Sequence, residues 1–110
     1  MHLFQSSLTP TPTTPLEAFQ AAEATYDGYA PKTITAWSEI ILAGAAYALY
    51  APTQTFEYSY VSGVTNTIGG YWIQLAGGDL NMIVLFSPGE SIAGPYQAVV
   101  RSPLQLFPWG

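Results

Sequence analysis

Few residues of this 110-residue chain could carry out catalysis. The only histidine is His2, beside the first residue, where chains usually fray. A Ser-His-Asp arrangement or a histidine metal site would therefore depend on a terminus. The chain contains no cysteine, which removes disulfide frameworks and thiolate metal sites. We expect neither a metal nor any other cofactor.

The carboxylates offer one remaining catalytic route, because two acids are sufficient for glycoside hydrolysis. Glu39 could pair with Glu57, or Asp79 with Glu90. These acids are widely scattered along the chain, and each fits a solvated strand or turn residue better than a catalytic one. The sequence therefore predicts a protein that is not an enzyme, with a small two-carboxylate hydrolase as an alternative.

Charge is scarce in this chain and mainly negative. Only 8% of the residues are charged, against a typical value of about 25%. Lys32 and Arg101 are the only lysine and arginine, against seven acids, which gives a net charge of -5. Nucleic-acid binding and a polybasic membrane anchor are excluded, because both need clustered cations. Each cation is expected to pair with a carboxylate of this chain or of a neighbour, and Arg101 is a candidate intersubunit contact.

No segment reads as a signal peptide or a membrane span. The first residues lack a basic region followed by a long apolar stretch. The longest weakly polar run, which starts at Ile40, is too short and too rich in glycine and alanine to cross a bilayer. We expect a soluble protein made in a cytoplasm.

The aromatic residues support two interpretations. Eight tyrosines and three tryptophans could form a carbohydrate-stacking platform, with Tyr58 and Tyr60 as its candidates. They equally suit a core and a protein interface, where tyrosine and tryptophan are enriched and charged residues are depleted. The low charge favours the interface. Trp37 and Trp72 are expected in the core.

The N-terminal part of the chain changes character at residue 14. Pro10, Pro12 and Pro15 interrupt a stretch of serine and threonine, so residues 1–13 are predicted to form an extended arm. A short helix is expected over residues 15–22, capped by Thr14, with Glu17 completing a capping box. Its buried face would consist of Leu16, Phe19 and Ala22.

From residue 14 to the end, the chain is predicted to be a single all-β domain with one short helix. Asp27-Gly28 is a turn signal, and Gly77-Gly78-Asp79 marks a hairpin between two apolar runs. Residues 64–70 and 87–96 are expected to be connections, and residues 103–110 a closing tail. About seven or eight short strands favour a β-sandwich or jelly roll, with a small, partly open barrel as the alternative. The expected strands are 33–41, 46–51, 54–61, 71–75, 80–86 and 97–102.

Nearly the whole chain resembles a group of short proteins from tailed-phage genomes and viral metagenomes. The shared motifs are structural and define no chemistry. The segments that carry the resemblance are Leu3-Phe4, "TPTPTT" (9–14), "LEAFQAAEA" (16–24), "GYAP" (28–31), "VTNTIGGYWI" (64–73) and the closing "PLQLF" (103–107).

The resemblance implies a virion structural protein, most closely a capsid decoration (cement) protein. Such a protein would bind the major capsid protein on the outer surface of the virion head, as a homotrimer. A tail-associated module that binds a receptor or carbohydrate is the alternative. Residues 3–13 would lie along a neighbouring subunit or the capsid. The predicted subunit and capsid contacts are Leu3, Phe4, Leu8, Pro10, Pro12, Arg101, Phe107 and Trp109.

Overall fold

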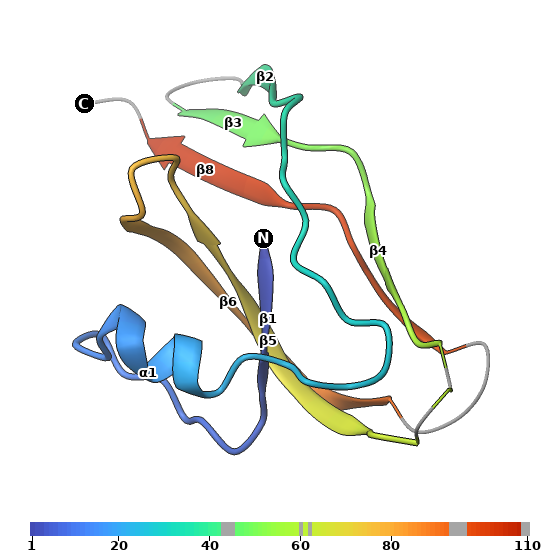
Figure 1. Ribbon diagram of the computed structural model, residues 1–110. Helices are drawn as coiled ribbons and strands as arrows, with labels where there is room; N and C mark the ends of the chain where they lie inside the picture. The colour runs from blue at the N-terminus through green and yellow to red at the C-terminus, as the bar shows by residue number, and fades with distance from the viewer. Residues whose placement is uncertain (43–45, 60, 62, 93–96, 109–110) are drawn as a thin grey trace.

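The structure, a computed structural model, describes residues 1–42, 46–59, 61, 63–92 and 97–108, without the side chains of 40–42, 46–47 and 105–108. This part of the chain is all-β apart from one short helix, and all of its strand pairs are antiparallel (Figure 1). The elements are β1 (His2–Gln5), α1 (Leu16–Ala21), β2 (Ser38–Leu42), β3 (Ala46–Tyr50), β4 (Gln54–Glu57), β5 (Asn66–Gln74), β6 (Leu80–Ile92), β7 (Ala98–Arg101) and β8 (Leu104–Pro108).

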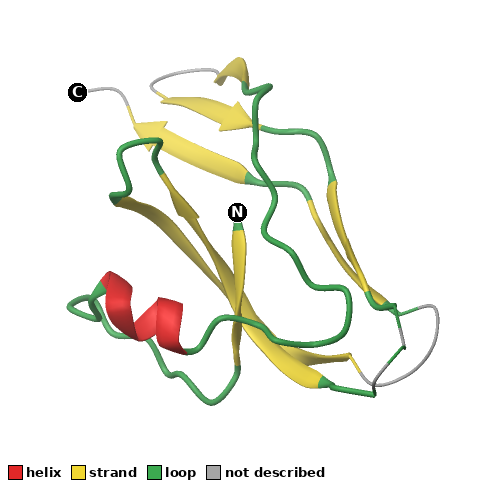
Figure 2. Ribbon diagram, viewed as in Figure 1, coloured by secondary structure: helices red, strands yellow, loops and turns green. Residues whose placement is uncertain are grey.

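The strands form three small sheets. The central sheet has the order β1-β5-β6, a second sheet has the order β2-β3-β8, and β4 pairs with β7. Figure 2 shows the single helix lying beside the central sheet, with the other two sheets on its far side. The central sheet therefore stands between the helix and the remaining strands, and each of its faces is covered.

Successive side chains of β1 point to opposite faces of the central sheet, so each face receives a core residue from this strand. Leu3 and Phe4 are each 0% exposed, and they point into different clusters. Phe4 packs on the helix side with Phe19 and Trp72, and the Phe4 and Phe19 rings meet edge to face at 5.3 Å. Burying side chains of this size stabilises a fold by about 1.5–3 kcal/mol each. The six-residue helix is thus held by packing, because so short a helix is not stable alone.

The larger cluster fills the opposite face of the central sheet. It joins residues of β1, β4, β5, β6 and β7 with the segment that follows the helix. Its buried members are Met1, Leu3, Ala24, Tyr26, Phe56, Tyr58, Ile68, Tyr71, Ile73, Ile92 and Val99.

Two adjacent glycines, Gly69 and Gly70, let β5 lie very close to its neighbours in the central sheet. The register of β5 against β6 shifts between Ile68 and Gly70, so Ile68 and Tyr71 point into the same cluster although they are three residues apart. A Cβ atom on Gly70 would lie 2.1 Å from the carbonyl oxygen of Val84 and 2.7 Å from the Phe4 ring. Glycine is therefore required here for close approach.

The strands β3 and β4 run as one bent strand against β8 and β7. Tyr50 is paired with Leu104 and Gln54 with Arg101, so three residues face two at the bend. The Ala51 N–H donates to the Pro103 carbonyl at 3.0 Å, which keeps the two halves joined there. We call these two long antiparallel strands, β3–β4 and β8–β7, the ribbon. The sheet β2-β3-β8 is the part of the ribbon on one side of the bend, with β2 added at its edge.

The predicted N-terminal arm is wrong for its first residues. They form β1, which pairs with β5 inside the sheet, so Leu3 and Phe4 are core residues and not partner contacts. The following loop folds back on its own domain, where Leu8 packs against the Phe4–Phe19–Trp72 cluster. The prolines that suggested an arm begin only at Pro10, after this strand has ended.

The two predicted connections are also corrected. Residues 66–70 belong to β5, and β6 continues through Pro88 and Gly89 to Ile92. Residues 93–96 of the second connection lie outside the described part. The predicted tail contains β8. Proline and glycine mark turns in most sequences, but here they occupy strand positions at or near register shifts, where a strand tolerates them.

The predicted helix is confirmed as Leu16–Ala21, although no side chain caps it. The Thr14 hydroxyl instead accepts a hydrogen bond from the Thr11 N–H at 2.7 Å, so the capping box is wrong. Phe19 is buried as expected, and Leu16 and Ala22 pack partly buried beside it.

Among the predicted strands, the hairpin is confirmed, with Gly78 at φ 94° in its turn. The strand predicted over 33–41 begins only at Ser38. Trp72 is 0% exposed as predicted, but Trp37 is 36% exposed because it precedes β2 in an extended segment without a described strand partner.

Candidate interaction surface

The structure separates both candidate carboxylate pairs. Asp79 lies in the hairpin turn and Glu90 is eleven residues further on, near the far end of β6, which corresponds to about 36 Å along an extended strand. Glu39 is paired with Leu49, eight residues before Glu57 on the β3–β4 strand, or roughly 25 Å. Two-carboxylate hydrolysis needs a separation of about 5–10 Å. Neither pair has the geometry for that reaction.

His2 is part of an ordered network that sequence reasoning missed. Its ring stacks on Trp72 with centroids 4.7 Å apart, and its Nδ1 lies 2.7 Å from the Glu23 carboxylate. The Tyr29 hydroxyl donates to the same carboxylate oxygen at 2.5 Å and accepts from the Leu3 N–H at 3.1 Å. The network ties β1 to the segment after the helix, so we assign it a structural role. No sequence spacing indicated it, because His2 and Glu23 meet only where β1 pairs with the segment after the helix.

Buried tyrosines make the stability of this protein sensitive to alkaline pH. Burial raises the pKa of Tyr26 from 10.0 to about 12. The pKa of Tyr29 is raised further, by burial and by its hydrogen bond to Glu23. In the unfolded chain these hydroxyls ionise near pH 10, while the native state still holds their protons. The unfolded state therefore binds fewer protons in this range, and the free energy of unfolding falls as the pH rises.

We expect the urea midpoint to fall progressively between about pH 10 and about pH 12. Tyr26→Phe should reduce this pH dependence, because it removes one of the shifted groups. Tyr50→Phe, at a 40% exposed position, is the matched control and should leave it unchanged. Equal pH dependence in the wild type and Tyr26→Phe would contradict the assignment.

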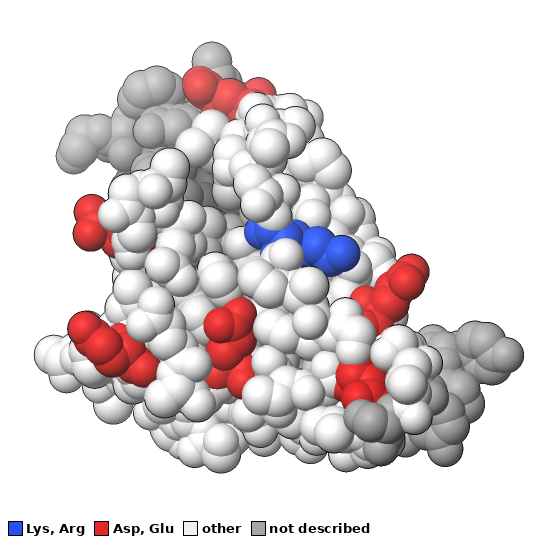
Figure 3. Space-filling model, in the orientation of Figure 1, with Lys and Arg blue, Asp and Glu red and all other residues white. Residues whose placement is uncertain are grey.

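Arg101 is engaged within its own chain. Its guanidinium pairs with the Glu90 carboxylate and lies 3.9 Å from the centroid of the Phe86 ring. Each cation was predicted to pair with a carboxylate of this chain or of a neighbour. For Arg101 this is confirmed, and the carboxylate belongs to its own chain. Lys32 places its ammonium 5.9 Å from the Phe56 ring centroid. On the face shown in Figure 3, basic atoms lie near the centre and acidic side chains are spread around them.

The remaining predicted contact residues have mixed outcomes. Pro12 is exposed, and Leu8 and Pro10 are partly buried. Phe107 belongs to β8, but its side chain is outside the described part, as is the whole of Trp109. Of the tyrosines proposed for sugar stacking, Tyr58 is 6% exposed in the core, and Tyr60 is not described. A stacking platform that uses Tyr58 is therefore wrong.

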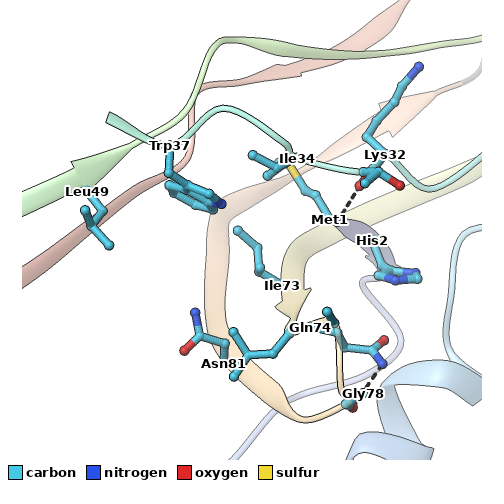
Figure 4. Close-up of a pocket in the computed structure, with 13 residues that line it drawn as sticks. Met1, His2, Lys32, Ile34, Trp37, Leu49, Ile73, Gln74, Gly78 and Asn81 are labelled. Carbon is cyan, nitrogen blue, oxygen red and sulfur yellow. Dashed lines mark hydrogen bonds between the residues drawn. The ribbon is translucent and has the colours of Figure 1, made fainter. Parts of the chain in front are cut away.

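A cleft lies between the hairpin end of the central sheet and the sheet β2-β3-β8. Its volume is about 660 Å³, within the range typical of binding sites. Figure 4 shows Trp37 lying over Ile73, with Leu49 and Asn81 beside them. The lining contains several apolar side chains and no aspartate or glutamate, although the chain has seven acids. The cleft is suited to an apolar partner group.

Further large apolar side chains are exposed beside the cleft and along the ribbon. Leu75 is 52% exposed at the hairpin, and Tyr50 and Leu104, which are paired across the ribbon, are 40% and 51% exposed. We call Trp37, Leu49, Tyr50, Leu75 and Leu104 the apolar surface. Trp37, Leu49 and Leu75 line the cleft, whereas Tyr50 and Leu104 point to the other face of their sheet, because successive side chains alternate along a strand. Large apolar side chains gathered at a cleft mark an interaction site more often than singly exposed ones do.

The described residues include no group of three His, Asp or Glu side chains that could hold a metal ion. Within the same residues, no helix has the length and apolar character needed to cross a membrane. No family model, curated protein or solved structure matches this chain.

Proposed function

We propose that this chain is a non-enzymatic virion structural protein that decorates the outer surface of an assembled phage head and stabilises it. The observation that carries the proposal is the apolar surface, a cleft and ribbon with exposed Trp37 and Tyr50 and no acid in the cleft lining. Aromatic anchors with few charges are typical of surfaces that bind another protein. The resemblance to decoration proteins names the partner, the major capsid protein.

Such a protein would act by mass action and not by turnover. A protein that binds the closed shell and not its dissociated form shifts the equilibrium towards the closed shell by its binding free energy, at each of many sites. Trp37 would supply an anchor, because its side chain lines the cleft and is 36% exposed to a partner. The fixed β-scaffold keeps the ordering cost of binding low.

The location of the protein on purified virions tests this proposal directly. We expect cryo-electron microscopy to find its density on the outer capsid lattice. Density on the tail would contradict decoration and would support the tail-associated alternative.

The anchor is tested by Trp37→Ala in reconstitution with shells that lack the protein. Removing a central aromatic anchor is expected to weaken shell binding by about 30-fold, which corresponds to about 2 kcal/mol. Val61→Ala removes an apolar side chain that is 85% exposed outside the apolar surface, and should bind as the wild type does. Equal binding by both variants would exclude the apolar surface as the contact.

A further inference from the structure

The outer edge of β6 has no strand partner among the described residues. At the opposite end of the central sheet, β1 is covered by the segment after the helix, where the Ala24 N–H donates to the Leu3 carbonyl at 2.9 Å. β6 is the other end of that sheet and pairs only with β5 within the described chain. Among the described residues, the Met82–Leu85 part of this edge therefore has backbone donors and acceptors without a strand partner.

This edge also lacks the features that usually prevent strand addition. Proteins protect such edges with lysine, other charges, proline or bulges. From Leu80 to Ser87, β6 contains no charged residue and no proline. Pro88 follows, and the Arg101–Glu90 pair lies over the far end of the strand. The unprotected part is thus confined to the first half of β6.

Within that half, Met82–Leu85 pairs in unbroken register with β5, and register shifts bound it on both sides. Met82 and Val84 pack against the larger cluster, and Ile83 packs on the helix side. Leu85, on the same side as Ile83, is 59% exposed. This stretch of the edge is therefore regular and apolar, and it carries one large apolar side chain, Leu85, that is more than half exposed.

We propose that this edge pairs with the β6 edge of a second copy, antiparallel about a two-fold axis at Val84. In that register Leu85 lies opposite Ile83 of the second copy, and both Val84 residues face each other. Self-pairing brings no like charges together, although the chain carries a net charge of -5, because all seven acids lie outside this stretch. The central sheets join into one six-stranded sheet across the dimer.

This contact closes at two copies, because a two-fold interface uses the same patch on both subunits. It therefore departs from the homotrimer that the resemblance implies, and it does not depend on the proposed function. Sedimentation equilibrium of the full chain distinguishes the two states. We expect a concentration-dependent approach to twice the chain mass of 11.8 kDa.

Leu85→Lys should weaken the dimer at least about tenfold, because it places two cations near each other at the pairing edge. Val61→Lys, at a position 85% exposed in the loop after β4, is the matched control and should leave the dimer intact. Far-ultraviolet circular dichroism and urea unfolding establish that both variants are folded.

A disulfide tests the register. The chain has no cysteine, so Val84→Cys introduces a single thiol at the two-fold axis, within reach of its copy. Mild oxidation should give a covalent dimer, whereas Val61→Cys should not at the same concentration. A monomer or a trimer at all concentrations would overturn the proposal, as would an unchanged dimer in Leu85→Lys. A dimer without the disulfide would overturn the Val84 axis.

Discussion

Replacing Gly70 with alanine is expected to destabilise the protein by about 3 kcal/mol or more, at the upper end of what overpacking costs. The new Cβ would lie 2.1 Å from the Val84 carbonyl oxygen, which belongs to the neighbouring strand backbone. It would also lie 2.7 Å from the Phe4 ring, whose side chain is 0% exposed. Neither atom can move without displacing β6 or the helix-side cluster. Urea unfolding followed by tryptophan fluorescence measures the loss.

Gly77→Ala provides a matched control in the same hairpin. A Cβ there would meet nothing within 4 Å, so the free energy of unfolding should change by less than about 0.5 kcal/mol. If Gly70→Ala were as stable as Gly77→Ala, β5 and β6 would not approach as closely as the structure has them.

Removing the Phe19 ring is expected to be the most damaging change in the helix. Phe19 is the helix's only buried side chain, and its ring contacts both Phe4 and Trp72. Phe19→Ala should cost about 3–5 kcal/mol, through lost burial and the cavity left behind. The six-residue helix should also lose its protection from hydrogen exchange, because packing is what stabilises it.

Two further variants separate packing from helix propensity. Phe19→Leu keeps most of the volume and should cost clearly less than Phe19→Ala. Gln20→Ala changes the next, exposed residue and should be nearly neutral or slightly stabilising. Equal losses for Phe19→Leu and Phe19→Ala would show that the helix-side cluster is not close-packed around this ring.

Local sequence signals predicted those elements whose causes are local. The Gly77-Gly78 hairpin and the short helix were found from turn residues and spacing. β1 was missed because it is only four residues long, and what makes it a strand is its pairing with β5, some 65 residues away. The extension of β6 through Pro88 was missed for a related reason: only a neighbouring strand shows that a proline occupies a tolerated position.

The interaction surface was less predictable than the fold. The low charge indicated an interface, but Trp37 was assigned to the core from its residue type alone. Its exposure follows from the late start of β2, which leaves residues 33–37 outside any sheet. The His2–Glu23 contact was also unpredictable, since it depends on the tertiary position of a residue near the terminus.

The bent ribbon separates two kinds of sequence constraint. No described side chain of β2, β3 or β8 belongs to either hydrophobic cluster, and the ribbon carries this sheet past the bend where Ala51 meets Pro103. Close packing restricts which residue types the core can hold, whereas the residue types of this sheet are restricted mainly by the partner that it contacts. Residues such as Tyr50 and Leu104 can therefore be substituted as the partner changes. Such substitutions leave the packing that stabilises the rest of the domain unchanged.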